Sequence, residues 1–228
     1  MTEAEWSICT DPTTMLASIL PIASDRKLRL FAVACCRRTS NDLLVESKSC
    51  RDAVDVGELF ADDLATLKDL DRAHGACVHF AGSFAFSHAP AVASYANLKE
   101  IVVQVPGMIT GAIIEVIEEN CADPETEAFW RGKIPVERSA QAALLRDIFH
   151  DHVFSPPAIE HAWLAWNHDT IPKLAQGIYH DCQFDRLPVL ADALEEAGCT
   201  NTDILNHCRG EGLHFRGCWV VDLILGKQ

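Results

Sequence analysis

The sequence predicts an all-α protein, a compact multi-helix domain of about eight to ten helices. Apolar residues recur at spacings of three and four along most of the chain, the pattern of helices with one buried face. Helix-starting residues, such as Asp11 followed by Pro12, precede several of these stretches. The stretches also end in residues that suit helix ends, such as Arg37 and Arg38 or Gly198.

The first third of the chain contains four of the expected helices. A short helix is expected over residues 11–21, and a longer one over 24–38. The apolar middle of the longer helix includes a single polar residue, Arg29, so we expect this helix to be central and mostly buried. Apolar stripes within 49–68 and 67–84 predict two more helices, and the acids of 49–68 form a solvated face.

The middle of the chain is unusually poor in charge. No Asp, Glu, Lys or Arg occurs from residue 73 to residue 98. Two interpretations stay open: helices buried on several sides, or a face that packs against another subunit. Residues 101–105 form a β-like pentad, and a helix follows through 109–117. We treat the chain as a single helical domain over 1–228; if it has two subdomains, the boundary falls in the candidate linker 122–135.

The last third is organised around two helical patterns joined by a short insert. Helices are expected over 171–179, over 184–197 with Asp185 as N-cap, and from Asn201 or Thr202 to about residue 210. The closing run CWVVDLILG could be a buried strand or a buried helix, because periodicity does not distinguish them. We favour a helix, since nothing nearby offers a strand partner, and we expect the N- and C-terminal motifs to pack together.

The insert carries five potential metal ligands within twenty residues, namely Cys199, His207, Cys208, His214 and Cys218. A zinc site needs about four Cys or His groups in tetrahedral array, and irregular loops supply such an array readily. The spacing C-x7-H-C-x5-H-x3-C lacks the C-x2-C pair of common zinc modules, and adjacent His207 and Cys208 point in different directions on a helix. The alternative is that the cysteines are small buried apolar residues and the histidines hydrogen-bond to backbone.

Composition limits the partners. The 228 residues carry a formal net charge of −14, which opposes nonspecific attraction to nucleic acid or anionic membranes. The N-terminus MTEAEWSICTDP has acids where a signal peptide needs basic residues, so we expect a cytoplasmic protein. Its ten cysteines are then thiols rather than a disulfide framework.

Three His-Asp dipeptides suggest a further hypothesis. They occur at His150-Asp151, His168-Asp169 and His180-Asp181. In HD phosphohydrolases such a dipeptide, with other His and Asp residues, holds divalent metal that activates water against a phosphate ester. Here His150, His152 and His161 lie in or beside a proline-containing loop rather than on one helix face, so the dipeptides are weak evidence.

Two parts of the chain carry distinctive sequence elements, namely TEAEW, CTDP and SDRKLRLFAVACCRR near the start, and QAALLRDIF, LPVLADALEEAGC, DILNHCRG and RGCWVVDLILGK near the end. Together these elements resemble a large paralogous family of small uncharacterised planctomycete proteins. The resemblance covers roughly residues 1–38 and 140–228. It implies a bacterial helical module without an assigned activity. The five Cys and His positions of the insert belong to its motif, which favours a metal site or a structural knot there, whereas His150, His152 and His168 match no motif.

The function that the sequence predicts is a non-catalytic interaction or scaffold module, which binds a protein partner or self-associates through the uncharged middle. The alternative is a metal-binding helical domain, either zinc-stabilised or a metal-dependent phosphohydrolase-like enzyme. No glycine-rich phosphate loop and no G-x-S-x-G element is present to support a nucleotide or hydrolase site.

Overall fold

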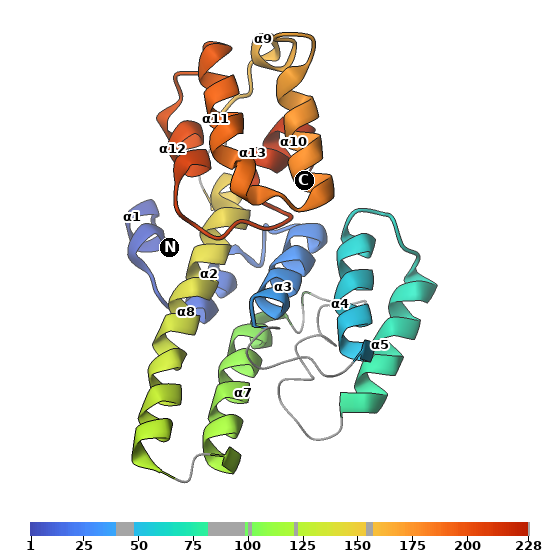
Figure 1. The fold of residues 1–228 in the computed structure, drawn as a ribbon, viewed down its shortest axis with the longest axis vertical. Coiled ribbons are helices and arrows are strands. Elements are labelled where there is room, and N and C mark those ends of the chain that lie inside the picture. The colour runs from blue at the N-terminus through green and yellow to red at the C-terminus, as the bar shows by residue number, and fades with distance from the viewer. Residues whose placement is uncertain (40–47, 82–98, 100–101, 121–122, 154–156, 228) are drawn as a thin grey trace. The chain divides into compact units, whose positions relative to one another are not determined.

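The computed structural model describes residues 1–39, 48–81, 99, 102–120, 123–153 and 157–227. These residues form twelve α-helices and two short 3₁₀ helices without a strand, which confirms the all-α prediction (Figure 1). The elements are α1 (Glu3–Ile8), α2 (Pro12–Ile19), α3 (Asp25–Thr39), α4 (Lys48–Ala61), α5 (Leu67–Ala81), η3 (Val102–Gln104), α7 (Val105–Asn120), α8 (Pro124–Val153), α9 (His161–Leu164), α10 (Thr170–Asp181), η4 (Phe184–Arg186), α11 (Leu187–Glu196), α12 (Thr202–Arg209) and α13 (Trp219–Leu225).

The chain divides into two compact units, Met1–Leu145 and Arg146–Gln228, so that the division falls within α8. The residues of the candidate linker 122–135 are helical from Pro124 onward, as part of α8. Pro135 lies inside the 30-residue helix, where it removes one backbone hydrogen bond without ending the helix. The packing of the N-terminal motif on the C-terminal motif stays a prediction.

The N-terminal unit is built on α3. Ser24 Oγ accepts a hydrogen bond from the backbone N–H of Lys27 at 3.2 Å and so caps this helix. The residues from Leu28 to Cys36 are buried, as expected for a central helix, and Arg29 is buried with them. Its guanidinium lies 5.0 Å from the ring centroid of Phe60, and burial lowers the pKa of Arg29 to about 10.

Polar contacts position the first part of α8 within this unit. Arg38 of α3 pairs with the buried Glu137, and Arg138 pairs with Asp11 at 2.8 Å. Asp11 also caps α2, since its carboxylate accepts from the backbone N–H of Thr13 at 3.1 Å. Ion pairs between residues 99 and 127 positions apart thus supplement the apolar core.

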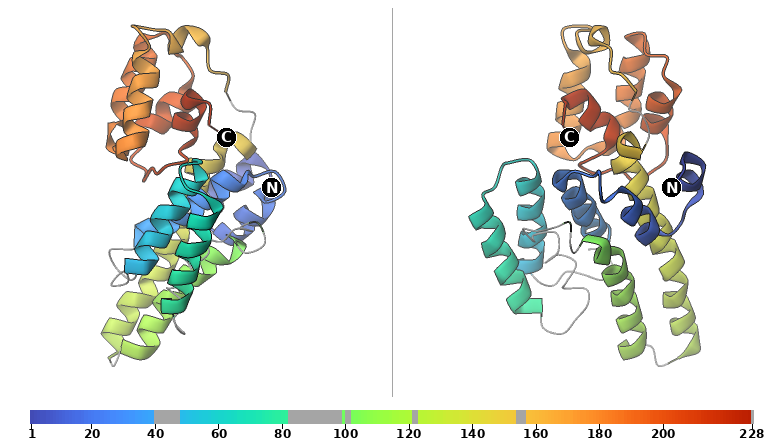
Figure 2. Two further views of the ribbon diagram at one scale, coloured as in Figure 1. Left: turned by 90° about the vertical axis from the view of Figure 1, so that its right-hand side faces the viewer. Right: turned by 180° about the vertical axis from the view of Figure 1, so that it is seen from behind.

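Helices α4 and α5 lie side by side in the same unit (Figure 2). The thiols of Cys50 and Cys77 face one another between them, with their sulfurs 3.2 Å apart. The β-like pentad at 101–105 is not a strand among the residues described there, because Val102–Gln104 form a 3₁₀ turn that leads into α7. Residues 82–98, most of the uncharged middle, lie outside the described residues.

The C-terminal unit has its own core, made by α10, α11, α12 and α13. The closing run is a helix, as favoured, and its Trp219, Val220 and Val221 are fully buried. Gly198 ends α11 with φ +94°, a value that suits glycine. Asp185 is not the expected N-cap, because it lies inside the 3₁₀ turn that precedes α11.

Two further features complete the description. Asn167, His168 and Asp169 form an unusual run of three non-glycine residues with positive φ just before α10. Among the described helices, none has the length and apolar content that crossing a membrane requires.

Candidate metal centre

Four side chains of the C-terminal unit bring potential metal ligands together. Asp147, His207, His214 and Cys218 each offer one atom, and these four atoms lie within 4.8 Å of one another. They are the single such group of three or more His, Cys, Asp or Glu residues in the described part of the chain. Asp147 comes from the end of α8, His207 from α12, Cys218 from the start of α13, and His214 from the loop between those helices.

Asp147 is the centre of the group. Its side chain is 5% exposed, and its Oδ1 accepts from His214 Nδ1 at 2.6 Å and lies 3.2 Å from His207 Nε2. The backbone N–H of Phe215 donates to Oδ2 at 3.4 Å. Burial alone would raise the pKa of Asp147, but the hydrogen bonds and charges of His207 and His214 outweigh burial and lower it. The group is therefore built around an ionised, buried carboxylate.

The proton on His207 is fixed by its neighbours. The indole N–H of Trp219 donates to His207 Nδ1 at 2.9 Å, so in the neutral ring the proton sits on Nε2. That nitrogen faces both Asp147 Oδ1 and Cys218 Sγ, each at 3.2 Å. Trp219 in turn stacks on His150, with ring centroids 4.6 Å apart. The ring of His207 is thus held from both sides.

Cys218 and His214 complete the group. Burial raises the pKa of the Cys218 thiol, and the charge of Asp147 raises it further, so without an ion this thiol is neutral. His214 keeps its Nε2 buried without a hydrogen-bond partner among the described residues. Such a buried polar atom costs about 1–3 kcal/mol. The group therefore combines satisfied hydrogen bonds with one unsatisfied buried nitrogen, His214 Nε2.

The chain matches no protein family model, no curated protein and no solved structure.

The donor set and part of the spacing fit a metal ion. In a tetrahedral zinc site with N, O and S ligands, neighbouring ligand atoms are about 3.3–3.6 Å apart, as follows from the bond lengths. The two 3.2 Å distances from His207 Nε2 are close to this value, whereas the 2.6 Å pair of His214 and Asp147 is a hydrogen bond. Coordination through His207 Nε2 would also move its proton to Nδ1, where Trp219 now donates.

The sequence named five candidate ligands, and the structure brings three of them together. His207, His214 and Cys218 belong to the group, whereas Cys199 and Cys208 lie in the hydrophobic core of the unit. Burial raises the pKa of both core thiols, that of Cys208 to about 12. The separation of His207 from its neighbour Cys208 follows from their adjacent positions on one helix.

Asp147 was not among the candidates. The signal for it lies in the sequence LLRDIF, because Leu144, Asp147 and Ile148 share one helical face that is otherwise apolar. An acid on such a face is buried, and a buried acid needs partners. This rule identifies Asp147 as a candidate from the sequence. The rule does not predict which residues become the partners of Asp147.

None of the His-Asp side chains that the structure describes belongs to the group. His180 and Asp181 pair with each other at 2.7 Å on the exposed surface, and His168 and Asp169 lie in the left-handed turn before α10. His150 stacks on Trp219, and the side chains of Asp151 and His152 lie outside the described residues. The phosphohydrolase hypothesis therefore has no assembled site in the part of the chain that the structure describes.

Proposed function

We propose that the C-terminal unit is a zinc-binding helical domain, with Asp147, His207, His214 and Cys218 as ligands, and that the ion has a structural role. The observation that supports it is the convergence within 4.8 Å of four ligand atoms from α8, α12, α13 and the loop between the last two helices. Buried charges in proteins are paired or coordinate metals, and the buried Asp147 carboxylate lies among three further ligand-type side chains.

The types of ligand favour zinc over other common ions. Magnesium and calcium prefer oxygen ligands, whereas one sulfur, two imidazoles and one carboxylate suit zinc. Catalytic zinc keeps a position open for water, while structural zinc is bound by four protein ligands. Four buried or half-buried side chains make a closed set, which supports the structural role.

The chain's own residues already carry out part of this role. Asp147 connects the end of α8 to the loop between α12 and α13, through His214 and the backbone of Phe215. Arg216 in the same loop donates to the backbone carbonyls of Tyr179 and His180. A bound zinc ion would add folding free energy at the point where these connections meet.

Elemental analysis of the purified, untagged and reduced protein tests the proposal. We expect about one zinc per chain, because a structural site retains its ion through purification. Cys218→Ala and His214→Gln should each reduce the zinc content at least tenfold, since every ligand contributes to the affinity.

Cys199→Ala and Cys208→Ala serve as matched controls. Both replace a buried cysteine of the same unit that lies outside the group, so they test for general loss of folding. We expect them to keep their zinc, and circular dichroism checks that all variants are folded. Metal-free protein, or full zinc content in Cys218→Ala, would contradict the proposal and leave the group as a hydrogen-bonded core network.

The second candidate function is that of a non-catalytic interaction or scaffold module. The observation that favours it is a set of exposed apolar side chains, Leu64 in the turn between α4 and α5 and Leu67 and Val78 on α5. Light scattering over a concentration series tests self-association, and a strict monomer would restrict this role to a different partner. Membership of the planctomycete family is likewise a proposal, and it supplies no chemistry for either function.

A further inference from the structure

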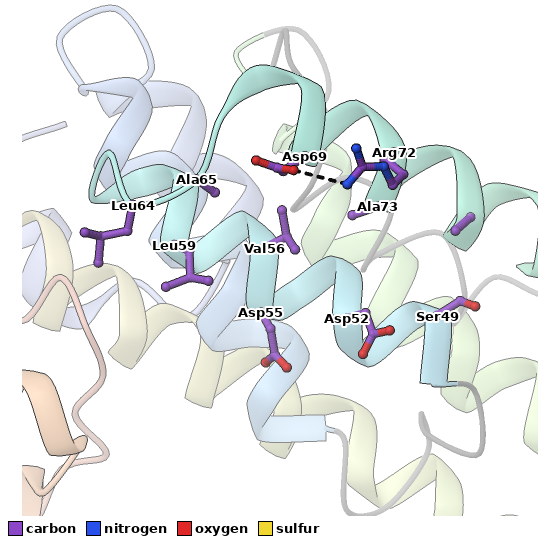
Figure 3. Close-up of a pocket in the computed structure, with 11 residues that line it drawn as sticks. Ser49, Asp52, Asp55, Val56, Leu59, Leu64, Ala65, Asp69, Arg72 and Ala73 are labelled. Atoms are coloured by element: carbon purple, nitrogen blue, oxygen red, sulfur yellow. Dashed lines mark hydrogen bonds and ion pairs between the residues drawn. The ribbon is translucent and has the colours of Figure 1, made fainter.

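An open groove runs between α4 and α5 in the N-terminal unit (Figure 3). Its volume is about 500 Å³, within the range of sites that take a ligand or a few side chains. Val56, Leu59 and Leu64 supply apolar surface, together with small alanine side chains from α5. Leu64 is 71% exposed and Leu59 is 38% exposed, so this surface remains in contact with water.

The polar borders of the groove are mainly acidic. Asp52 and Asp55 line the α4 side, and Asp69 lines the α5 side, against a single lining cation, Arg72. The three carboxylate side chains are 50%, 57% and 41% exposed. The groove therefore combines exposed negative charge on its borders with exposed apolar side chains.

The existing ion pairs of these acids can be exchanged. Asp52 pairs with Lys48, whose side chain is 80% exposed, and Asp69 pairs with Arg72, whose side chain is 68% exposed. Pairs of this kind contribute about 0–1 kcal/mol, so an incoming cation can replace them at small cost. Arg37 would keep its 2.7 Å pair with the buried Glu58 if Asp55 changed partner.

We propose that this groove docks an amphipathic helix of a partner protein, with apolar residues toward Leu59 and Leu64 and with Lys or Arg residues beside the three aspartates. The charge of the borders decides the class of partner, because a helix with acidic flanks would be repelled. The inference rests on the interaction role proposed above and is independent of the metal centre, which belongs to the other unit.

Fluorescence anisotropy with designed peptides tests the inference on the full chain. The probe is a fluorescein-labelled helical peptide of about 16 residues with leucines at i, i+4 and i+7 and lysines on both flanks. We expect binding in the micromolar range that weakens as salt increases. A peptide with the same leucines but glutamate flanks should bind at least tenfold more weakly.

Variants of the groove locate the binding. Leu64→Ser should weaken binding about tenfold, and Asp52→Lys combined with Asp55→Lys should weaken it by a similar factor. The matched controls are Val189→Ser, at an exposed apolar residue of α11, and Asp185→Lys, at an exposed acid, and both should bind as the wild type does. Treatment with a zinc chelator should leave binding unchanged.

Three results would overturn the inference. Equal affinity for the lysine and glutamate peptides, or wild-type affinity in the groove variants, would show that the groove and its charge do not select the partner. The interaction role itself could survive these results, and the light-scattering series decides that question separately. If no peptide binds at about 100 µM, an affinity weaker than most specific interactions, the groove is not a docking site.

Discussion

At the scale of single residues, Asp147 is the most consequential side chain of the C-terminal unit. Three donors surround its buried carboxylate, two imidazoles and one backbone N–H. A charged acceptor in this position stabilises its partners only while it remains ionised, because a neutral amide would turn an N–H₂ group toward at least one donor.

We expect Asp147→Asn to reduce the free energy of unfolding by about 2–4 kcal/mol, since it leaves donors of a buried network without a charged acceptor. Urea denaturation at pH 7 measures the effect. Asp185→Asn, at an exposed acid, is the control and should change stability by less than about 0.5 kcal/mol. Similar small effects for both variants would show that the network does not stabilise the unit.

The thiols differ strongly in exposure. Cys182 is exposed at the end of α10, whereas burial raises the pKa of Cys36 and Cys208 to about 12. We expect Cys182→Ser to remove a fast phase of reaction with a colorimetric thiol reagent at pH 8. Cys208→Ser should leave the fast phase intact. Retention of every fast-reacting thiol in Cys182→Ser would contradict this assignment.

The residue scale also shows what sequence patterns can predict about the site. His207, His214 and Cys218 were candidates because ligand-type side chains are dense in the insert. Asp147 comes from a helix sixty residues earlier, and periodicity places it in the core without naming its partners. A stretch dense in Cys and His therefore identifies the ligands that lie close together in the sequence. A ligand from a distant helix, such as Asp147, is found only from the fold.

At the scale of elements, Asp11 links two helices. It caps α2 through Thr13 and pairs with Arg138 of α8. The hydroxyl of Thr14 donates to its carboxylate at 2.6 Å, and this hydrogen bond lowers the pKa of Asp11 below its usual 3.8. The contribution of Asp11 to stability is therefore complete at neutral pH and is lost as the pH falls through 3.8 and below.

We expect Asp11→Ala to destabilise the protein by about 1–2 kcal/mol at pH 7, because it removes both the cap and the ion pair. The difference from the wild type should shrink below about pH 3.8, where the wild-type carboxylate gains its proton. Asp11→Asn retains a cap and should lose much less. Chemical denaturation at several pH values checks this, and a difference that grows in acid would contradict it.

Helices were predictable where the apolar periodicity agreed with a helix-starting or helix-ending residue. The cap at Asp11, the buried stretch of α3 and the glycine end of α11 each combined a pattern with a start or stop residue. The candidate linker 122–135 and the β-like pentad at 101–105 were read from local preferences, and the structure has helical turns at Val102–Gln104 and from Pro124 onward. Just beyond its proline, α8 makes the ion pairs of Glu137 with Arg38 and of Arg138 with Asp11.

At the scale of the whole molecule, the division into two units separates the two proposals. The candidate metal centre belongs to Arg146–Gln228, and the groove belongs to Met1–Leu145. Removal of zinc should therefore affect one unit and leave the other unchanged, since an ion stabilises only the fold that binds it.

Hydrogen exchange with and without chelator measures this separation. We expect amides of α12 and of the loop 210–218 to exchange at least tenfold faster after zinc removal. Amides of α4 and α5 should keep their rates and serve as the internal control. Equal acceleration in both units would show that the ion acts on the whole chain.

The fold class followed from composition and periodicity, because helices with a buried stripe leave a repeated pattern in the sequence. The division within α8 was not predictable, since a continuous helix gives no compositional sign of where contacts change from one unit to the other. The division into units depends on which helix faces pack against each other. A single sequence shows which faces are apolar, but it does not show which of them are in contact.

The hydrogen bond from Trp219 to His207 has a practical consequence. Metal coordination at His207 Nε2 would place a proton on the nitrogen that the indole now faces, so the indole must give up this hydrogen bond. The emission colour and intensity of this one fluorophore would then change with occupancy. The difference between wild type and Trp219→Phe would isolate it from the other four tryptophans. The fluorescence of Trp219 would thus report whether the candidate site is occupied by an ion.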